Sequence, residues 1–294
     1  LVSEISGKTL ASVRRSYTWP DAGTIFGEIA AEVATIRSGL TDLQRSRLAG
    51  IGVSSPSMIG RNIGLMGAPA EQVTLWNGID LADRIARDTD LSVQWFNDGN
   101  AACWAEVVLH TAPRPQGFAY FQVGTFVAAG LVANGELWEG NGHAANLGSM
   151  LVCDDDGKPT YVHLIASIVA LQRLLAKAGM DLPSGSPFNW NWDALEPVAS
   201  QWLDRSGLAL AKAVVNTRAV IELDTTVIDG VMPRDVVVRL LDRVRYHLSQ
   251  LPVLSVDHPT VEMGHLGASA SATGAAQLVL FQRYFSRGWK LFAT

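Results

Sequence analysis

The strongest constraint on the fold is a short apolar run that ends in a single carboxylate at the start of a helical pattern. The run extends from Leu91 to Phe96 and is followed by Asn97 and Asp98, after which small residues open the helical pattern at Ala101. A buried strand that ends just before a helix is typical of open α/β sheets, whose ligands bind at the carboxyl ends of the strands. We therefore expect Asp98 to lie at a ligand-binding edge.

Two roles for Asp98 are compatible with this position. A carboxylate within hydrogen-bond reach of a substrate hydroxyl acts as a general base, and small neighbouring residues allow the backbone to approach a ligand closely. Alternatively, Asp98 caps the following helix, because aspartate is among the residues preferred at that position.

The composition excludes several classes of protein. The 294 residues are 48% hydrophobic with a net charge of −5, so a substantial core is available, disorder is not expected, and a basic footprint for nucleic acid is lacking. Cys103 and Cys153 are the only cysteines, which excludes a disulfide framework and fits a reducing cytosol. This cysteine usage leads us to expect a cytoplasmic protein. The longest charge-free window, 115–135, is broken by Gln122 and by glycines, so we expect no membrane span.

Helical and strand patterns alternate in the first part of the chain. Apolar spacing predicts helices over 25–48, 80–89 and 100–109, and apolar runs predict strands over 48–53 and 91–96. This alternation favours an α/β layered fold. Residues 1–10 read as strand, turn and strand, from which we expect a further segment upstream of Leu1.

The pattern changes after residue 117. The segments 118–131 and 136–137 predict a hairpin closed by Asn134-Gly135, a strong two-residue turn signal. The remaining predicted elements are a helix over 160–178, a helix over 192–220 broken at Ser206-Gly207, a strand over 225–228, a helix over 233–251 that starts at Pro233, a strand over 261–263 and a helix over 270–285. Glu106 and His265 carry no motif, and we expect Glu106 on a solvated helix face.

Five segments carry a family resemblance in the right order along nearly the whole chain. They are Gly50-Ile51-Gly52-Val53-Ser54-Ser55-Pro56, Asn97-Asp98-Gly99-Asn100-Ala101-Ala102, the segment 123–130, the segment 134–149 and the segment 266–276. In that order they resemble the G-x-P-G loop, the N-D-A-N-A-A motif, the G-T-G-I-G-G-G phosphate loop, the N-G-x-L…N-G-A-A-G-E-I-G-H stretch and the closing A-x-L-G…G-A-A helix of one family. That family is ROK (repressor, open reading frame, kinase), of the sugar kinase/actin/Hsp70 superfamily.

The resemblance implies a fold. It is the two-domain ribonuclease H-like (actin-like ATPase) α/β fold with an interdomain cleft, with Asp98 at the wall of that cleft. We expect a smaller domain over 1–110, completed by a C-terminal helix over 269–294, and a larger domain over 111–268.

The resemblance also implies a set of sugar-binding residues. The family's E-x-G-H motif has Asn146 in place of the glutamate and Ser149 in place of the histidine, so hydrogen-bonding groups remain but without charge. The glutamate that follows the family's zinc run aligns with His163, which either faces the sugar or is an ordinary helix residue. With Asn97 and Asp98, these three residues are the candidates.

The phosphate loop departs from the family pattern. The family residues that remain, together with one glycine further on, are the candidates for a nucleotide site: Gly124, Thr125, Gly130 and Gly230. The other glycines of the loop are replaced by Phe126, Ala128 and Ala129. Glycine permits positive φ and close backbone approach to phosphate, so Phe126 is expected to crowd a nucleotide; the alternative is a loop that binds phosphate differently. The family's first phosphate motif, D-x-G-G-T, does not occur at the start of the chain.

The family's zinc run, C-x-C-G-x-x-G-C, is also missing. Cys153 is followed by residues 154–159 without a second cysteine, and one thiolate cannot supply a closed four-ligand site. We therefore expect no zinc.

Two functions fit these motifs. The first is a sugar-binding effector domain of a ROK transcriptional regulator, homodimeric, that contacts DNA only through residues outside this chain. The second is an ATP-dependent sugar kinase of carbohydrate metabolism, which uses ATP, Mg and Asp98 as general base. The altered E-x-G-H motif, the missing zinc run and the crowded phosphate loop favour the regulator. A degenerate scaffold that binds no sugar stays open.

Overall fold

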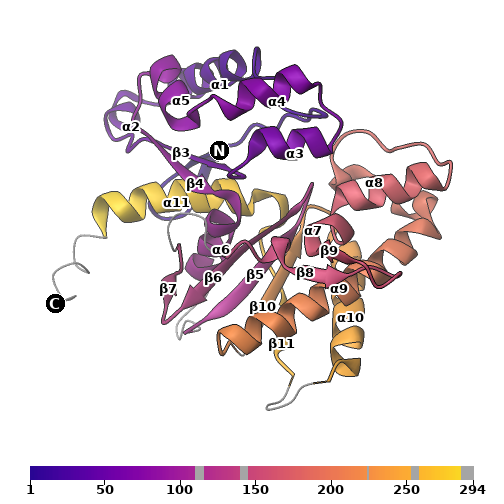
Figure 1. The fold of residues 1–294 in the computed structure, drawn as a ribbon. Coiled ribbons are helices and arrows are strands. Elements are labelled where there is room, and N and C mark those ends of the chain that lie inside the picture. Colours follow the sequence, from indigo (N-terminus) through magenta and orange to yellow (C-terminus); the bar gives the residue numbers. More distant parts are fainter. Residues whose placement is uncertain (110–115, 140–144, 224, 253–257, 286–294) are drawn as a thin grey trace. The chain divides into compact units, whose positions relative to one another are not determined.

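The computed structural model describes residues 1–109, 116–139, 145–223, 225–252 and 258–285. The chain divides into two compact units, Leu1–Ala105 with Ser271–Thr294 and Glu106–Ala270 (Figure 1). Each unit has its own hydrophobic core, with Phe26 in the first and Trp202 in the second. That these two units are the smaller and the larger domain predicted from the sequence stays a proposal.

The first unit contains a parallel pair of strands and a set of helices. The strands β3 (Ile51–Ser55) and β4 (Val93–Asn97) are paired so that Ser55 lies opposite Asn97. The other elements are β1 (Val2–Ser3), β2 (Thr9–Ala11), α1 (Ile25–Gly39), α2 (Asp42–Ser46), α3 (Ile59–Leu65), α4 (Ala70–Asn77), α5 (Leu81–Thr89), α6 (Asp98–Leu109) and α11 (Ala270–Tyr284). From Glu106 on, α6 belongs to the second unit. The α/β alternation predicted for this part of the chain is confirmed.

The helix predicted over 25–48 is two helices. Leu40 adopts an extended conformation after α1, and Thr41 then starts α2 with a capping box. In that box the Thr41 hydroxyl accepts from the Gln44 N–H at 3.2 Å, and the Gln44 side chain accepts from the Thr41 N–H at 2.9 Å. Helices α3 and α4 were not predicted, because glycines interrupt the apolar periodicity of 57–79.

Two glycines of the family motifs allow close packing of α11. A Cβ on Gly274 would lie 1.6 Å from the carbonyl oxygen of Ala101 on α6, and one on Gly52 would lie 2.2 Å from that of Ala275. Any side chain at either position would force α11 away. The G-A-A pattern is therefore a packing feature of this unit.

The second unit is built on a five-stranded sheet in the order β11-β10-β5-β6-β7. Its strands are β5 (Phe118–Val123), β6 (Val127–Ala133), β7 (Glu136–Leu137), β10 (Thr225–Gly230) and β11 (Thr260–Met263). β5, β10 and β11 are parallel, and β6 and β7 are antiparallel to their neighbours. The predicted turn at Asn134-Gly135 is confirmed, with positive φ at both residues. The segment 118–131, however, contains a further turn, at Gly124.

Two helix predictions for this unit are wrong in detail. The helix expected over 160–178 is divided into β9 (Pro159–Tyr161), α7 (Val162–Ile165) and α8 (Ile168–Lys177), and β9 pairs with β8 (Leu151–Cys153). The expected break at Ser206-Gly207 is absent from α9 (Val198–Val220). A Cβ on Gly207 would lie 2.6 Å from Cβ of Arg243 on α10 (Arg234–Gln250), so this glycine permits close helix packing.

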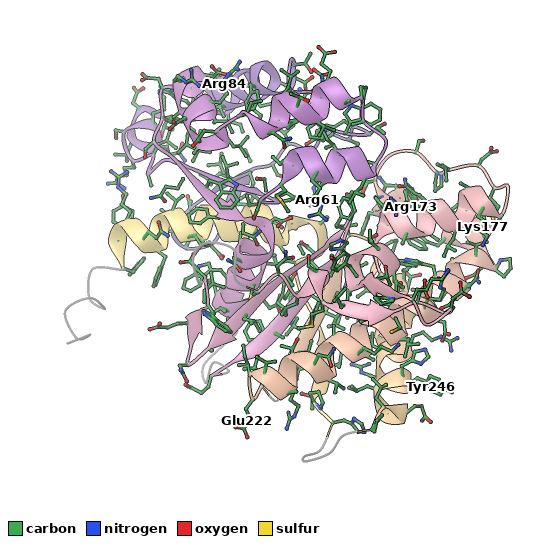
Figure 2. The ribbon with its side chains drawn as sticks, in the orientation of Figure 1. Arg61, Arg84, Arg173, Lys177, Glu222 and Tyr246 are labelled. Carbon is green, nitrogen blue, oxygen red and sulfur yellow. The ribbon has the colours of Figure 1, made fainter. Side chains whose placement is uncertain are left out.

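Several charged side chains on or next to helices are exposed. Arg61 on α3, Arg173 and Lys177 on α8, and Glu222 after α9 are exposed (Figure 2). Within the part of the chain that the structure describes, no helix is both long enough and apolar enough to cross a membrane.

Candidate functional site

Asn97 and Asp98 lie where β4 ends and α6 begins. Asn97 caps the helix, because its Oδ1 accepts hydrogen bonds from the N–H groups of Gly99 at 3.0 Å and Asn100 at 3.2 Å. Its Nδ2 donates to the hydroxyl of Ser57 at 3.4 Å. The capping role considered for Asp98 therefore belongs to its neighbour.

The Asp98 carboxylate is the titratable group of this strand end. Its Oδ1 accepts from the N–H of Gly99 at 2.9 Å. Burial raises the pKa of Asp98 to about 6, while the hydrogen bond from Gly99 acts in the opposite direction. A carboxylate with a pKa this close to neutrality changes its protonation near working pH, which suits both general-base chemistry and hydrogen bonding to a hydroxyl.

In the second unit, the turn between β5 and β6 contacts the start of α8. The carbonyl of Gly124 accepts from the Ile168 N–H at 2.9 Å, and that of Thr125 accepts from the Val169 N–H at 3.4 Å. Ser167 Oγ accepts from the Ala170 N–H at 3.2 Å. The N–H groups of a helix N-terminus can bind an anion, but here they are bonded to the chain's own oxygens.

Phe126 and His163 meet at this turn. The two ring centroids are 5.9 Å apart in an edge-on arrangement, and Tyr161 stacks on His163 from β9 with centroids 5.6 Å apart. His163 lies on α7 and is half-buried. These three rings form one aromatic cluster beside the turn.

The other replaced glycines of the phosphate loop do not lie in a loop. Ala128 and Ala129 are in β6, opposite Gln122 and Phe121 of β5. Gly130 is buried in the same strand opposite Tyr120. The structure thus leaves Gly130 outside the turn, and Phe126 is the only replaced position within it.

Asn146 precedes the short helix η1 (Leu147–Ser149), and Ser149 is its last residue. A Cβ on Gly148 would lie 2.4 Å from the carbonyl oxygen of Val127, so this helix packs against the start of β6. Asn146 is exposed and Ser149 half-buried. Strands β8 and β9 pair, and the Val162 N–H donates to the Met150 carbonyl at 3.1 Å. Ser149 directly precedes Met150 and His163 directly follows Val162, so the chain segments that carry Ser149 and His163 lie side by side.

Gly230 lies at the carboxyl end of β10, beside the turn. It is opposite Val123, and the next residue, Val231, donates from its N–H to the carbonyl of Val123 at 3.0 Å. The structure therefore brings Gly124, Thr125 and Gly230 together. The Gly230 N–H donates at 2.8 Å to Asp229, whose side chain is fully buried.

Sequence reasoning missed a second group of polar residues at the same strand ends. Glu106, expected on a solvated face, is fully buried. It accepts from the His265 N–H at 3.2 Å and pairs with Nδ1 of the same residue. A signal was present, since Glu106 is the only charged residue between Ala101 and Leu109. Gln122 donates from Nε2 to the Gly267 carbonyl at 2.6 Å.

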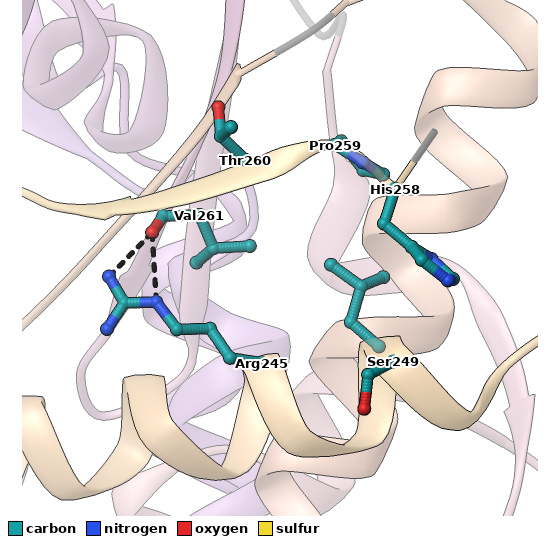
Figure 3. A pocket seen from close by; sticks show the side chains of 7 residues that line it. Arg245, Ser249, His258, Pro259, Thr260 and Val261 are labelled. Carbon is teal, nitrogen blue, oxygen red and sulfur yellow. Dashed lines mark hydrogen bonds between the residues drawn. The ribbon is translucent and has the colours of Figure 1, made fainter. Parts of the chain in front are cut away.

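A surface pocket lies at the opposite, amino end of β11. It has a volume of about 310 Å³ and is lined by Arg245, Ser249, His258 and Thr260 among others (Figure 3). Arg245 donates from Nε and Nη2 to the Val261 carbonyl at 3.2 and 2.7 Å. This pocket contains none of the predicted site residues. Among the residues described, no group of three or more His, Cys, Asp or Glu side chains is placed to hold a metal ion.

Comparisons with known proteins agree with this architecture. The model of the ROK family matches residues 7–282. The glucokinase of that family from Streptomyces griseus, solved with glucose and AMPPNP, superimposes with a TM-score of 0.68 at 20% identity, covering 94% of this chain and 93% of that chain. A transcriptional regulator of the family, a homologue of the E. coli MLC protein, superimposes with a TM-score of 0.65 at 16% identity. The match covers 95% of this chain and 74% of that chain.

A curated relative extends beyond the matched region. The protein y4fQ of Sinorhizobium fredii is 27% identical over 248 residues, which are 83% of this chain and 60% of that protein. The chain thus spans about 60% of the length of this relative.

Proposed function

The chain belongs to the ROK family, and we propose that it is the sugar-binding effector domain of a transcriptional regulator. The contact between Phe126 and His163 carries this proposal. Phosphate binding at such a turn needs glycine backbone that approaches the ligand closely. Here the turn holds an aromatic side chain that packs on a neighbouring ring, which supports a turn without a nucleotide.

The bonding of nearby N–H groups supports the same proposal. The first N–H groups of α8 are bonded to Gly124 and Thr125, and the N–H of Gly230 is bonded to Asp229. Each is a donor that a phosphate would otherwise recruit. Their use within the chain favours a domain that functions without ATP.

We propose that the ligand is a neutral monosaccharide or a close derivative. Asn97, Asp98, Asn146 and Ser149 would hydrogen-bond its hydroxyls, with His163 as a ring contact. The net charge of −5 is unsuited to a DNA surface, so DNA would be contacted by residues outside the chain described. The protein would act in the cytoplasm as a homodimer.

An ATP-dependent sugar kinase is the second candidate, and one observation favours it. The pKa of Asp98 is raised to about 6 by burial, and a general base works best when its pKa lies near the operating pH. In that case ATP and Mg would be cofactors, and Gly124, Thr125 and Gly230 would face the nucleotide.

One experiment on the full-length protein separates the two candidates. Calorimetry against a panel of sugars identifies the ligand, and a coupled ATPase assay with that sugar measures turnover. Binding without turnover supports the regulator. Turnover in the range of ~1–10³ s⁻¹ typical of enzymes, lost in Asp98→Asn, would instead establish the kinase. A protein that binds no sugar of the panel would be a scaffold.

A further inference from the structure

The side chain of Asp229 sits in a cradle of backbone N–H groups. Its Oδ1 accepts from Gly230 at 2.8 Å, and its Oδ2 accepts from Leu266 at 3.2 Å and Gly267 at 2.7 Å. These donors come from the carboxyl end of β10 and from the segment that follows β11. Converging backbone N–H groups of this kind bind anions such as carboxylate and phosphate.

The segment 264–267 is fitted around this carboxylate. A Cβ on Gly264 would lie 2.6 Å from Cβ of Asp229 and 2.8 Å from its carboxylate, so only glycine fits there. Gly267 has a φ of +53°, a left-handed conformation that glycine adopts without strain. Both glycines are thus explained by the shape of the cradle.

Two further side chains hold the same segment. Arg234 donates from Nη1 to the Gly264 carbonyl at 2.5 Å, and that atom lies 3.9 Å from Oδ1 of Asp229. Gln122, which lies on β5, donates a hydrogen bond to the Gly267 carbonyl. A fully buried carboxylate is costly unless it is hydrogen-bonded, and here the three N–H groups supply those bonds while Arg234 supplies a nearby positive charge.

We propose that Asp229 is a resident anion, which fills a cradle built for the carboxylate or phosphate oxygens of a ligand. The native cradle then takes up no external anion, and the segment 264–267 is ordered without one. Removing the side chain turns the cradle into a binding site for small oxyanions. This inference holds whichever function the sugar site has, because Asp229 and its three N–H donors include none of the sugar-site candidates.

Chemical rescue of Asp229→Ala tests the proposal. The variant is expected to unfold at a lower temperature than the native protein, and sodium formate is expected to restore part of the loss in a saturable manner. At ten times its dissociation constant, formate would raise the folding equilibrium constant about elevenfold. Sodium chloride at equal ionic strength serves as the salt control. No effect of formate on Asp229→Ala beyond that of chloride would overturn the proposal.

Two matched variants separate a specific site from general stabilisation. Ile228→Ala opens an apolar cavity in the same buried strand without N–H donors, and Asp229→Asn leaves the cradle filled. Neither is expected to respond to formate. Equal stabilisation of all three variants would contradict the inference.

A measurement on the native protein covers the case in which Asp229→Ala does not fold. Hydrogen exchange at Leu266 and Gly267 is expected to be slow and unaffected by saturating inorganic phosphate or by ATP with Mg. Fast exchange there, or exchange slowed by either probe, would show that the cradle is open in the native protein.

Discussion

The ring of Phe126 stands edge-on to the imidazole of His163, with 5.9 Å between the centroids and 77° between the planes. One residue comes from the turn after β5 and the other from α7. The sequence placed these two residues in separate predicted sites, one for nucleotide and one for sugar. In the structure they belong to a single cluster, so replacing Phe126 is expected to alter the packing of His163.

Replacing Phe126 by glycine, the residue that the family motif has there, is expected to destabilise the second unit. Phe126 is half-buried, and the loss of its packing and of the aromatic pair should lower the free energy of unfolding by roughly 1–2 kcal/mol. Urea unfolding measures this change. Phe126→Leu keeps an apolar side chain and should lose less; equal loss in both variants would argue against a specific ring contact.

Asp98→Ala is expected to weaken binding of the best sugar by at least about tenfold. A hydrogen bond to a charged group contributes ~1.5–3 kcal/mol, and the variant removes it. Calorimetry on the full-length protein measures the affinity. Asp42→Ala removes an almost fully exposed carboxylate of the same unit and is the control. Unchanged affinity in Asp98→Ala would mean that the sugar binds elsewhere.

The raised pKa of Asp98 predicts a pH dependence of stability. Its folded-state pKa of about 6 lies above the ~3.9 of an unfolded aspartate. The stability that the protonated form contributes is therefore fully present below about pH 4 and is lost as pH rises through 6. A shift of about two pKa units corresponds to roughly 3 kcal/mol.

Asp98→Asn does not titrate and provides the reference for that measurement. The free energy of unfolding of the native protein, taken relative to Asp98→Asn, should decrease between pH 4 and pH 7. A difference that is constant over this range, or that grows with pH, would contradict the assignment of the raised pKa.

The pair formed by Glu106 and His265 is expected to be energetically coupled. His265→Ala removes the imidazole from the fully buried Glu106 and leaves it the backbone N–H of residue 265. Removing one hydrogen-bond partner of a buried polar group is destabilising. A loss of ~1–3 kcal/mol is expected at neutral pH. Adding Glu106→Gln removes the charge and should recover part of that loss. A double-mutant cycle measures the coupling, and additive effects would show that the contact contributes nothing.

If the chain is a regulator domain, sugar binding must change the affinity of the full-length protein for its operator. A ligand shifts such an equilibrium only through its differential affinity for the two states, and couplings of ~1–3 kcal/mol, about 5- to 150-fold, are typical. Operator binding with and without sugar, at fixed salt because phosphate contacts are salt-dependent, tests this. The fragment Leu1–Thr294 alone should not bind DNA. Identical operator binding with and without sugar would rule out coupling between sugar binding and DNA binding.

Local patterns in the sequence determined much of the fold. The apolar run before Asn97 predicted a strand, and the small residues after Asp98 predicted a helix; both are present as β4 and α6. Asn134-Gly135 predicted its turn, because few residue pairs adopt positive φ at both positions. The order of the family motifs predicted the ROK fold, which the family match confirms. The strand, helix and turn signals each reside in a few consecutive residues.

Tertiary structure decided what consecutive residues do not encode. Glu106 and His265 are 159 positions apart, so their contact exists only because the chain folds α6 against the segment after β11. Gly207 looked like a helix break, but the close approach of Arg243 makes it a packing residue. Asp229 gave no motif, and its environment is created by N–H groups from 37 and 38 positions away. Burial and long-range hydrogen bonding, which depend on the assembled sheet, assigned these residues their roles.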